Sequence, residues 1–402
     1  MFSSTEKATQ KRAKLHNKRL VLKTIYDRGP ISRADIARAT HLARTTVSNV
    51  VTSLMAEGLV LEVGQRLLER GKPATLLRVD DDARHIIGID LGGREFNGVI
   101  ADLRGAIIQR RRTPLADLTG EAALERVYQL LDALVAAADE GALLGIGIGA
   151  PGVVDASLGL IRQSGRLQWR DMPLQKLLED RYHLPVHIAN DSHVAALGEY
   201  TFGNGHTGPN LVVITVGMGV SAGVVLDGRL HLGDSFGAGE IGHVTVVTGP
   251  EAQRCSCGNT GCLETVVSEG ALIAQARDIA RRNPQSKLHQ FAPTSKAIDL
   301  QAILQAFNAD DDDLNQVILQ MGRRLGYSVA TVVSILNVEQ VIISGSLARF
   351  GAPLIQAIRT EFKSTIHPML AAKTKIHPSH LGQDIVVKGA VATVLSAEMA
   401  LV

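Results

Sequence analysis

The hydrophobic residues of the first 80 positions recur at helical spacing and then switch to alternation. This pattern predicts three helices and then a strand, over residues 11–28, 33–39, 43–57 and 59–63. Ser32 is placed to cap the second helix, and Gly58 ends the third. Two helices separated by a three-residue break and followed by a strand are typical of a helix-turn-helix with a wing. We therefore expect a winged-helix domain over residues 1–80.

The rest of the chain contains one strand pattern twice. Each copy predicts three short strands joined by tight turns, over residues 85–90, 97–102 and 106–110 and over residues 211–216, 221–226 and 229–232. Helices follow each set, as predicted over residues 121–138 and 314–336, which indicates an internal duplication. We expect an α/β fold of two lobes with a ligand cleft between them. The first lobe is assigned to residues 84–190, rejoined by a C-terminal helix over 386–402, and the second, with an oligomerisation surface, to 191–385.

Composition adds little beyond this division into domains. Of the 402 residues, 45% are hydrophobic and 20% are charged, which excludes a disordered or fibrous protein. No apolar run reaches the roughly 18 residues that a membrane-spanning helix needs. The first residues also lack the apolar core of a signal peptide. We therefore expect a cytoplasmic protein that does not contact a membrane.

Charge is distributed unevenly along the chain. Residues 1–72 contain fourteen Lys or Arg and six Asp or Glu, whereas acidic residues predominate in the remainder. The third predicted helix carries short polar side chains opposite its apolar face, namely Arg44, Thr45, Thr46, Ser48, Asn49 and Thr52. A solvated helix would more often carry Glu and Lys there, whereas a helix in the major groove needs short donors and acceptors. The pattern favours DNA contact through this face.

A basic segment follows the predicted wing. It reads Arg70-Gly71-Lys72-Pro73, in which Arg70 and Lys72 flank a glycine. Such an arm is suited to following phosphates or entering a minor groove. Alone, the segment would be a plain basic linker, but its place directly after a helix-turn-helix favours DNA binding.

The three cysteines of the chain lie within eight residues, at Cys255, Cys257 and Cys262. A disulfide framework does not need three cysteines in one turn, and three free thiols in a row would be open to oxidation. In a reducing compartment this cluster indicates a metal site, and three thiolates favour zinc with a fourth ligand from elsewhere. We expect one structural Zn²⁺ per chain.

The residues around this cluster resemble the signature of the ROK family (repressor, open reading frame, kinase). The signature runs from Gly239-Glu240-Ile-Gly-His243 through Cys255-Ser-Cys257-Gly-Asn-Thr-Gly-Cys262-Leu-Glu264. The resemblance covers nearly the whole chain and includes Ala150-Pro-Gly-Val-Val-Asp155, Ala189-Asn190-Asp191 and Gly345-Ser-Leu347. It implies an actin-like, ribonuclease-H-like body of two lobes. The added winged helix is what separates the family's repressors from its sugar kinases.

The resemblance also implies a zinc ligand and a sugar pocket. The family uses the position of His243 as the fourth zinc ligand, and His231 and His206 are competitors outside the motif. Family kinases hold hexose hydroxyls at positions that here read Asn190, Asp191, Glu240, His243 and Glu264. Carboxylates and an amide are suited to vicinal hydroxyls, and a zinc-bound imidazole keeps its other nitrogen for a hydroxyl. In a kinase, the position of Asp191 holds the general base. The alternative is that these acids only cap helices or pair with surface arginines.

The phosphate-binding loops depart from the kinase pattern. Family kinases carry Asp-x-Gly-Gly-Thr at the first strand turn, whereas this chain has Arg94 after Gly93 and then Glu95. The second loop is usually Gly-Thr-Gly, and here Met218 replaces the Thr. Two hydroxyls are lost and a negative charge is added, so we expect no kinase activity. A phosphate contact by Arg94 would keep the kinase alternative open.

A third departure concerns the ligand. Family members often have an Asn before the Trp that follows the Pro-Gly loop, and here Arg166 precedes Trp169 at that place. An arginine in a sugar cleft can bind a carboxylate or phosphate through two N–H groups, which predicts an anionic inducer. The alternative is that Arg166 points to solvent or pairs with Asp171.

Together these features predict a sugar-responsive transcriptional repressor that binds operator DNA as a homodimer or homotetramer. Two half-sites on a symmetric dimer supply the affinity that a single winged helix lacks. Sugar binding would close the lobes and change the spacing of the heads, provided that the ligand prefers one conformation. The alternatives are a DNA-tethered sugar kinase and a sensor released by a partner protein.

Overall fold

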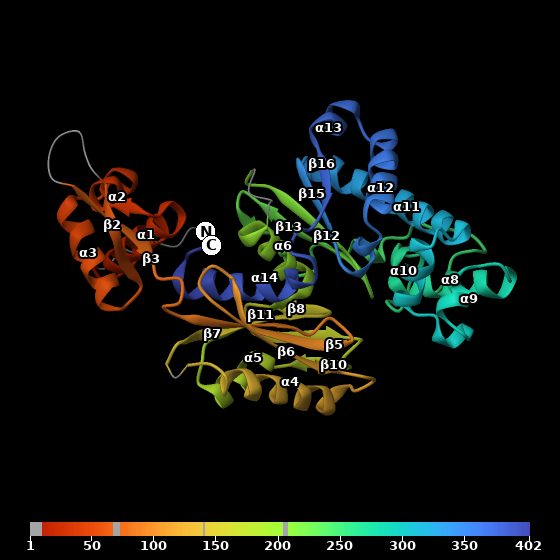
Figure 1. Ribbon diagram of the computed structural model, residues 1–402, viewed down its shortest axis with the longest axis horizontal. Coiled ribbons are helices and arrows are strands. Elements are labelled where there is room, and N and C mark those ends of the chain that lie inside the picture. Colours follow the sequence, from red (N-terminus) through yellow and green to blue (C-terminus); the bar gives the residue numbers. More distant parts are fainter. Residues whose placement is uncertain (1–9, 67–72, 140, 204–207) are drawn as a thin grey trace.

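The structure is a computed structural model that describes residues 10–66, 73–139, 141–203 and 208–402 (Figure 1). The N-terminal head packs three helices on a small sheet of order β1-β3-β2. Its elements are α1 (Gln10–Arg28), β1 (Ile31–Ser32), α2 (Arg33–Thr40), α3 (Arg44–Ala56), β2 (Val60–Arg66) and β3 (Ala74–Val79). The Ser32 hydroxyl accepts the Asp35 N–H at 3.2 Å, which confirms the predicted cap of α2. Arg70 and Lys72 lie outside the described residues.

The body contains two five-stranded sheets of the same topology. The first has the order β11-β7-β4-β5-β6 and the second the order β16-β15-β12-β13-β14. In each sheet the first three strands in sequence are joined as antiparallel hairpins and the last two add in parallel. The strands are β4 (His85–Asp90), β5 (Glu95–Ala101), β6 (Ile107–Pro114), β7 (Leu143–Ala150), β11 (Val186–Asn190), β12 (Leu211–Val216), β13 (Val220–Leu226), β14 (Arg229–Leu230), β15 (Gln340–Ser344) and β16 (Lys375–Pro378). The predicted α/β fold with a duplicated strand pattern is confirmed.

Several predicted boundaries were wrong, including the end of the strand predicted over residues 59–63, which continues to Arg66 as β2. Strand β6 continues to Pro114, beyond the predicted end at Arg110, through three consecutive arginines. As an edge strand it pairs on one side only, with β5, and edge strands tolerate charged side chains. The helix predicted to end at Ala138 is α4 (Gly120–Val135), which ends three residues earlier.

Two helices lie between the sheets and pack against each other, α6 (Asp191–Phe202) and α14 (Ile385–Val394) (Figure 1). Glycines allow the close approach. A Cβ on Gly147 of β7 would lie 1.9 Å from the Ala390 carbonyl oxygen, and one on Gly389 would lie 1.7 Å from the Val194 carbonyl oxygen. Helix α14 also packs on β4 and β7, so this C-terminal helix returns to the first sheet.

The remaining elements cover the sheets. In the first lobe, β8 (Val153–Asp155), β9 (Leu160–Ser164) and β10 (Trp169–Met172) form a small sheet beside α5 (Leu174–Tyr182). The second lobe adds α7 (Glu264–Val267), α8 (Glu269–Arg282), α9 (Leu288–Phe291), α10 (Leu300–Asn308), α11 (Asp312–Leu336), α12 (Gly351–Thr365) and α13 (Pro368–Lys373). Short 3₁₀ turns occur at Ile241–His243, Ser295–Ala297, Ser346–Phe350 and Gly382–Asp384. None of the described helices is both long and apolar enough to cross a bilayer.

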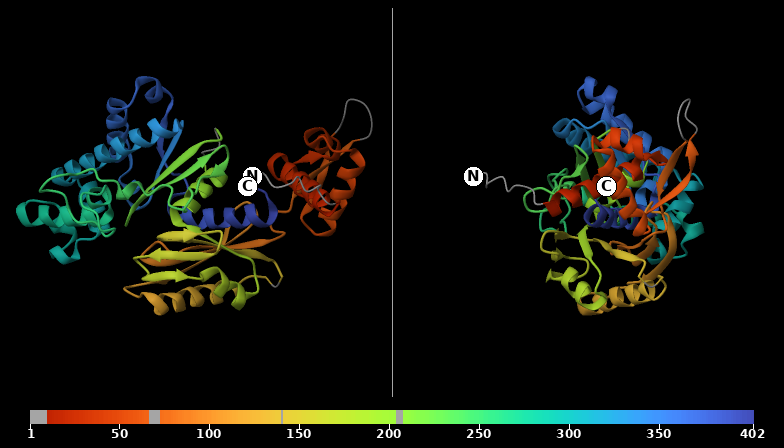
Figure 2. Two further views of the ribbon diagram at one scale, coloured as in Figure 1. Left: turned by 180° about the vertical axis from the view of Figure 1, so that it is seen from behind. Right: turned by 90° about the vertical axis from the view of Figure 1, so that its left-hand side faces the viewer.

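The head is seated against the C-terminal end of the body (Figure 2). One hydrophobic cluster contains Ile25 of α1 together with Leu395 and Leu401, which lie in and after the π-helical turn that follows α14. The Lys23 ammonium donates to the Leu401 carbonyl oxygen at 2.9 Å. The Tyr26 hydroxyl donates to the Leu103 carbonyl oxygen at 2.7 Å. The head and the body therefore share part of one core.

Candidate functional site

The expected metal ligands come together in the second lobe. The ligand atoms of His243, Cys255, Cys257 and Cys262 all lie within 4.8 Å of one another. A turn brings them together, because the Cys255 N–H donates to the Asn259 carbonyl oxygen at 2.8 Å. Among the described residues His231 is not part of this cluster, and His206 lies outside them.

The spacing of the donors fits zinc. Two thiolates bound to one tetrahedral zinc at about 2.3 Å lie about 3.8 Å apart, and a thiolate and an imidazole nitrogen lie about 3.6 Å apart. The Sγ atoms of Cys257 and Cys262 are 3.7 Å apart, and Cys255 Sγ lies 3.6 Å from His243 Nδ1. Burial raises the pKa of the Cys262 thiol, so a bound cation would be needed to hold it as a thiolate. A Cys₃His set with this spacing can hold Zn²⁺ in a closed structural site.

The second ring nitrogen of His243 faces Glu240. His243 Nε2 lies 3.7 Å from Glu240 Oε2, while Nδ1 faces the cysteines. Burial raises the pKa of Glu240, the His243 ring lowers it, and the charge of Glu264 raises it further. Glu264 accepts the Val220 N–H at 3.2 Å at the start of β13. The expected sugar ligands Glu240 and Glu264 therefore lie next to His243, which is also an expected metal ligand.

Asn190 and Asp191 lie where β11 ends and α6 begins. The Asn190 carbonyl oxygen caps α6 by accepting the N–H groups of Ser192 at 2.9 Å and His193 at 3.2 Å. Its amide donates to the Gly152 carbonyl oxygen at 2.9 Å, which ties it to the Pro-Gly loop. Asn190 therefore has a structural role in addition to any ligand contact, and one amide N–H remains.

Asp191 lies close to a second half-buried carboxyl, that of Asp90. Burial, with the nearby charges of Asp90 and Glu240, raises the pKa of Asp191 to about 7. Burial raises the pKa of Asp90 to about 6, although it accepts the Gly92 N–H at 2.7 Å. Asp191, Glu240 and Glu264 form a chain of neighbouring acids, as the sugar pocket requires.

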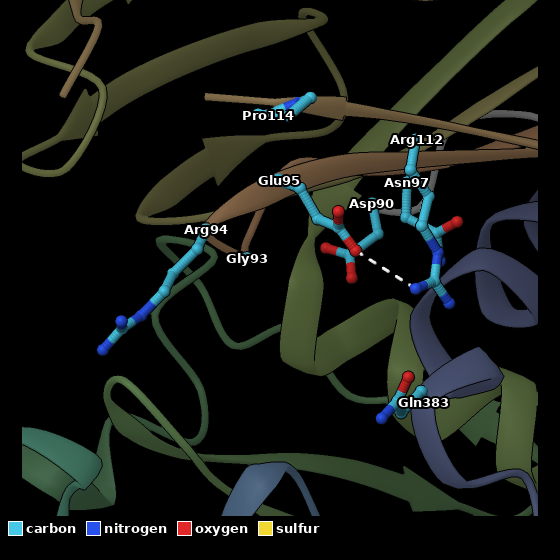
Figure 3. Close-up of a pocket in the computed structure, with 8 residues that line it drawn as sticks. All are labelled: Asp90, Gly93, Arg94, Glu95, Asn97, Arg112, Pro114 and Gln383. Atoms are coloured by element: carbon cyan, nitrogen blue, oxygen red, sulfur yellow. Dashed lines mark ion pairs between the residues drawn. The ribbon is translucent and has the colours of Figure 1, made fainter. Parts of the chain in front are cut away.

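A cavity of about 640 Å³ continues from Asp191 between the lobes. Its lining includes both loops that depart from the kinase pattern, with Gly93 and Arg94 on one side and Met218 on the other. A neighbouring pocket of about 410 Å³ shares Asp90 and Arg94 with it (Figure 3). Several acids and two arginines line the larger cavity, so it is not a uniformly basic phosphate site.

The charged substitutions in the first loop already have protein partners. The Arg94 guanidinium pairs with Glu269 of α8 at 2.8 Å, and Glu95 pairs with Arg112 at 3.2 Å. In Figure 3 the Arg94 side chain extends away from the Glu95–Arg112 pair. Glu269 was not expected from the sequence, because its partner lies 175 positions away. The family resemblance singled out the first loop but not the residue that it contacts.

The alternative that Arg166 pairs with Asp171 was wrong. Arg166 is half-buried, donates to the Gly93 carbonyl oxygen and lies 3.2 Å from the Met218 sulfur through Nη1. Asp171 pairs instead with Arg162 at 3.2 Å. The pairing of β9 with β10 explains this, because residues 170 and 172 oppose 163 and 161, which places Asp171 across from Arg162.

The DNA-contact candidates of α3 lie on its outer face. Val47, Val51 and Leu54 are buried in the head, whereas the polar residues between them are exposed or half-buried. The exposed residues are Arg44, Thr45, Ser48 and Asn49, and Thr46 is half-buried. The structure thus separates an apolar face from a polar face as the sequence indicated.

Both the head and the body of the chain are similar to known proteins. The ROK family pattern matches residues 86–397 and the MarR family pattern matches residues 16–61. The xylose repressor of Caldicellulosiruptor bescii is 32% identical over 94% of this chain and 95% of its own length. The N-acetylglucosamine repressor of Escherichia coli O157:H7 is 29% identical over 86% of this chain and 84% of its own. The predicted family resemblance is confirmed.

Kinases are also similar to the body. The glucokinase of Halalkalibacterium halodurans is 32% identical over 76% of this chain and 93% of its own length. Among solved structures, a ROK family transcriptional regulator described as a homologue of the E. coli MLC protein has a TM-score of 0.83 at 26% identity, covering 97% of this chain and 98% of its own. A ROK glucokinase from Streptomyces griseus with glucose and AMPPNP has a TM-score of 0.71 at 26% identity, covering 77% and 98%. The kinases match the body, whereas the regulator matches the head as well.

Proposed function

The chain belongs to the ROK family, and from that premise we propose that it is a sugar-responsive transcriptional repressor without catalytic activity. The observation that carries the proposal is the presence, in one chain, of a polar, exposed face on α3 and a row of neighbouring acids at Asp191, Glu240 and Glu264, of which Asp191 lines the cavity between the lobes. Relatives that match nearly the whole chain are named as repressors responding to xylose or N-acetylglucosamine. The proposal places the protein in the cytoplasm, where operator DNA is accessible and zinc thiolates stay reduced.

DNA recognition is assigned to α3. Arg44, Ser48 and Asn49 supply the donors and acceptors that read base edges in the major groove, with Thr45 and Thr46 beside them. Arg70 and Lys72, which lie between β2 and β3 in the sequence, contact phosphates in this proposal. A homodimer or homotetramer presents two heads to two half-sites.

The sugar is held at the start of α6 and beside the metal loop. Asp191, Glu240 and Glu264 accept hydrogen bonds from hydroxyls, Asn190 donates one, and His243 adds the ring nitrogen that faces Glu240. Zn²⁺, held by His243, Cys255, Cys257 and Cys262, supplies no reaction step. It fixes the orientation of the imidazole and of the loop that carries Glu264.

The absence of catalysis rests on the phosphate side of the cleft. Phosphoryl transfer depends on positioning and on groups that neutralise phosphate charge. Here the hydroxyls expected in both loops are replaced by Arg94 and Met218, and Arg94 is paired with Glu269. A polyphosphate would have to displace that carboxylate and approach Glu95.

The test begins with DNA selected from a random pool by the full-length protein. Fluorescence anisotropy should show tight binding to the selected duplex, with release on adding D-xylose, D-glucose or N-acetylglucosamine. Arg44→Ala should weaken binding by about 1–3 kcal/mol and relax the preference at one base pair. The matched control is Arg38→Ala in α2, where the guanidinium pairs with Asp35. Equal affinity for selected and random DNA would overturn the proposal.

One observation favours a second function, a DNA-tethered sugar kinase. The pKa of Asp191, raised to about 7, suits a general base near neutral pH. A coupled assay with ATP and a hexose panel decides between the two functions. Turnover of roughly 1–100 s⁻¹ that Asp191→Asn abolishes would establish the kinase, and no turnover supports the repressor.

A further inference from the structure

Three residues that depart from the kinase pattern meet at one place in the structure. Arg94 and Arg166 both belong to the first lobe, and Met218 lies in the loop of the second lobe that faces them. Arg166 links the two loops, because Nη2 donates to the Gly93 carbonyl oxygen and Nη1 lies 3.2 Å from the Met218 sulfur. The two loops that face a nucleotide in a kinase are therefore joined here through Arg166.

The carboxylate that receives Arg94 is firmly held. Glu269 is 7% exposed and is the first residue of α8. Its N–H donates to the Gly217 carbonyl oxygen at 2.7 Å, and its Oε2 accepts the Ser346 hydroxyl at 2.9 Å. Its Oε1 accepts Arg94 Nη2 at 2.8 Å. Glu269 thus joins the Gly217 loop, the Ser346 turn and the first lobe.

The ion pair differs from an ordinary surface pair in one respect. The Arg94 side chain is 63% exposed, which weakens the attraction by solvent screening, but Glu269 is almost fully buried. Removal of Arg94 leaves a buried carboxylate whose remaining side-chain hydrogen bond among the described residues comes from the Ser346 hydroxyl. Loss of one partner of a buried charge costs more than the pair itself contributes. The contact therefore favours conformations in which the two lobes touch here.

We propose that Arg94 and Arg166 form a direct clamp between the lobes, in place of the nucleotide that joins them in a kinase. The clamp biases the cleft toward closure, so that a sugar can close it without a nucleotide. The last step rests on the proposed function, whereas the clamp itself does not. It assigns a positioning role to Arg94, Arg166 and Glu269, none of which is required to touch the sugar.

Hydrogen–deuterium exchange of the intact, zinc-containing chain, without sugar or DNA, tests the clamp. Arg94→Ala should speed exchange about three- to tenfold in residues 217–220 and 264–272, because Glu269, which ties the Gly217 loop to the start of α8, loses the contact that holds it against the first lobe. The matched control is Arg112→Ala, which breaks another Arg–Glu ion pair beside the same pocket, one between two exposed side chains of the first lobe (Figure 3). Arg94→Lys keeps the charge and should give an intermediate rate. Equal effects of Arg94→Ala and Arg112→Ala would overturn the clamp.

Calorimetry with D-xylose, D-glucose and N-acetylglucosamine separates the clamp from the proposed function. If Arg94→Ala loosens the loops and also weakens binding of a sugar about three- to tenfold, both are supported. Faster exchange with no sugar bound by the wild type supports the clamp and counts against the sugar-responsive repressor. Sugar binding that needs ATP in the wild type overturns closure without a nucleotide, even where the exchange result holds.

Discussion

The two ends of the interlobe cleft use their polar groups in opposite ways. On the sugar side, Asp191 and Glu264 each use one carboxylate oxygen in the hydrogen bonds of the described residues, and the other oxygen remains for a ligand. On the phosphate side, Arg94 is paired with Glu269 and Arg112 with Glu95. The difference distinguishes a binding site from a closed contact, because among the described residues the carboxylates of Asp191 and Glu264 have no ion-pair partner, whereas Arg94 and Arg112 each have one.

The largest expected effect is loss of the metal that supports the sugar side. Cys257→Ser should leave less than about 0.1 equivalent of zinc and lower the free energy of unfolding by about 4 kcal/mol. The sugar response should be lost as well, because the loop presents His243 and Glu264. Elemental analysis, thermal melts and DNA release measure the three outcomes. Ser256→Ala, at an exposed neighbour, is the control. Wild-type protein with less than about half an equivalent of zinc would contradict the metal assignment.

Asp191→Asn should produce the next largest effect and should sharpen the contrast between the two ends. Sugar affinity should fall about 10- to 100-fold, because a charged acceptor for hydroxyls is lost, while DNA binding remains. The Asp191→Asn substitution also replaces a titratable carboxyl with an amide that does not titrate. The raised pKa of Asp191, about 7, means that the folded state binds this proton more tightly than the unfolded chain does.

The pH dependence of stability therefore has a definite sign. The contribution of Asp191 is fully present below its unfolded pKa, near 4, and is lost as the pH rises through about 7. Wild type minus Asp191→Asn should show stability falling between pH 4 and 7 in thermal melts. Asp180→Asn, at an exposed ion pair with Lys176, is the control for general charge effects. A difference curve that is flat or rises with pH would contradict the assignment.

The smallest expected effect concerns the charge of the ligand. Arg166→Asn should reduce the preference for a sugar phosphate or sugar acid over its neutral counterpart if the inducer is anionic. In the structure Arg166 contacts Gly93 and Met218, so an anion would have to compete for the guanidinium. Calorimetry with D-glucose and D-glucose 6-phosphate measures the ratio. If Arg166→Asn leaves the ratio of the two affinities unchanged, Arg166 has no role in selecting an anionic ligand, and its role in the clamp remains.

What the sequence predicted depended on how local the interaction is. The sequence indicated three local features, namely the Ser32 cap, the two faces of α3 and the cysteine cluster. In each of them the residues involved lie close together in the sequence. The duplicated strand pattern was also visible, because strand and turn residues alternate over short stretches.

Contacts between distant segments were not predictable in the same way. No sequence motif links Arg94 to Glu269, which lie far apart in the chain. Arg166 and Asp171 are close in sequence, but the register of β9 and β10 places Asp171 opposite Arg162 instead. Family resemblance supplied the candidate sugar ligands, which residue types alone would have left open. It did not supply the helix-capping role of Asn190, which depends on where β11 ends.

The contact between the N-terminal head and the C-terminal segment of the body has a consequence for folding during translation. Lys23 bonds to the carbonyl of Leu401, 378 positions later, and the shared cluster includes Leu395 and Met399. A ribosome adds about 5–20 residues per second, so the head waits roughly 20–75 s for the surface on which it docks. During that interval Val21 and Ile25 of α1 lack their partners at the far end of the chain. The domain that reads DNA is translated early and reaches its final position only after nearly all of the body has been made.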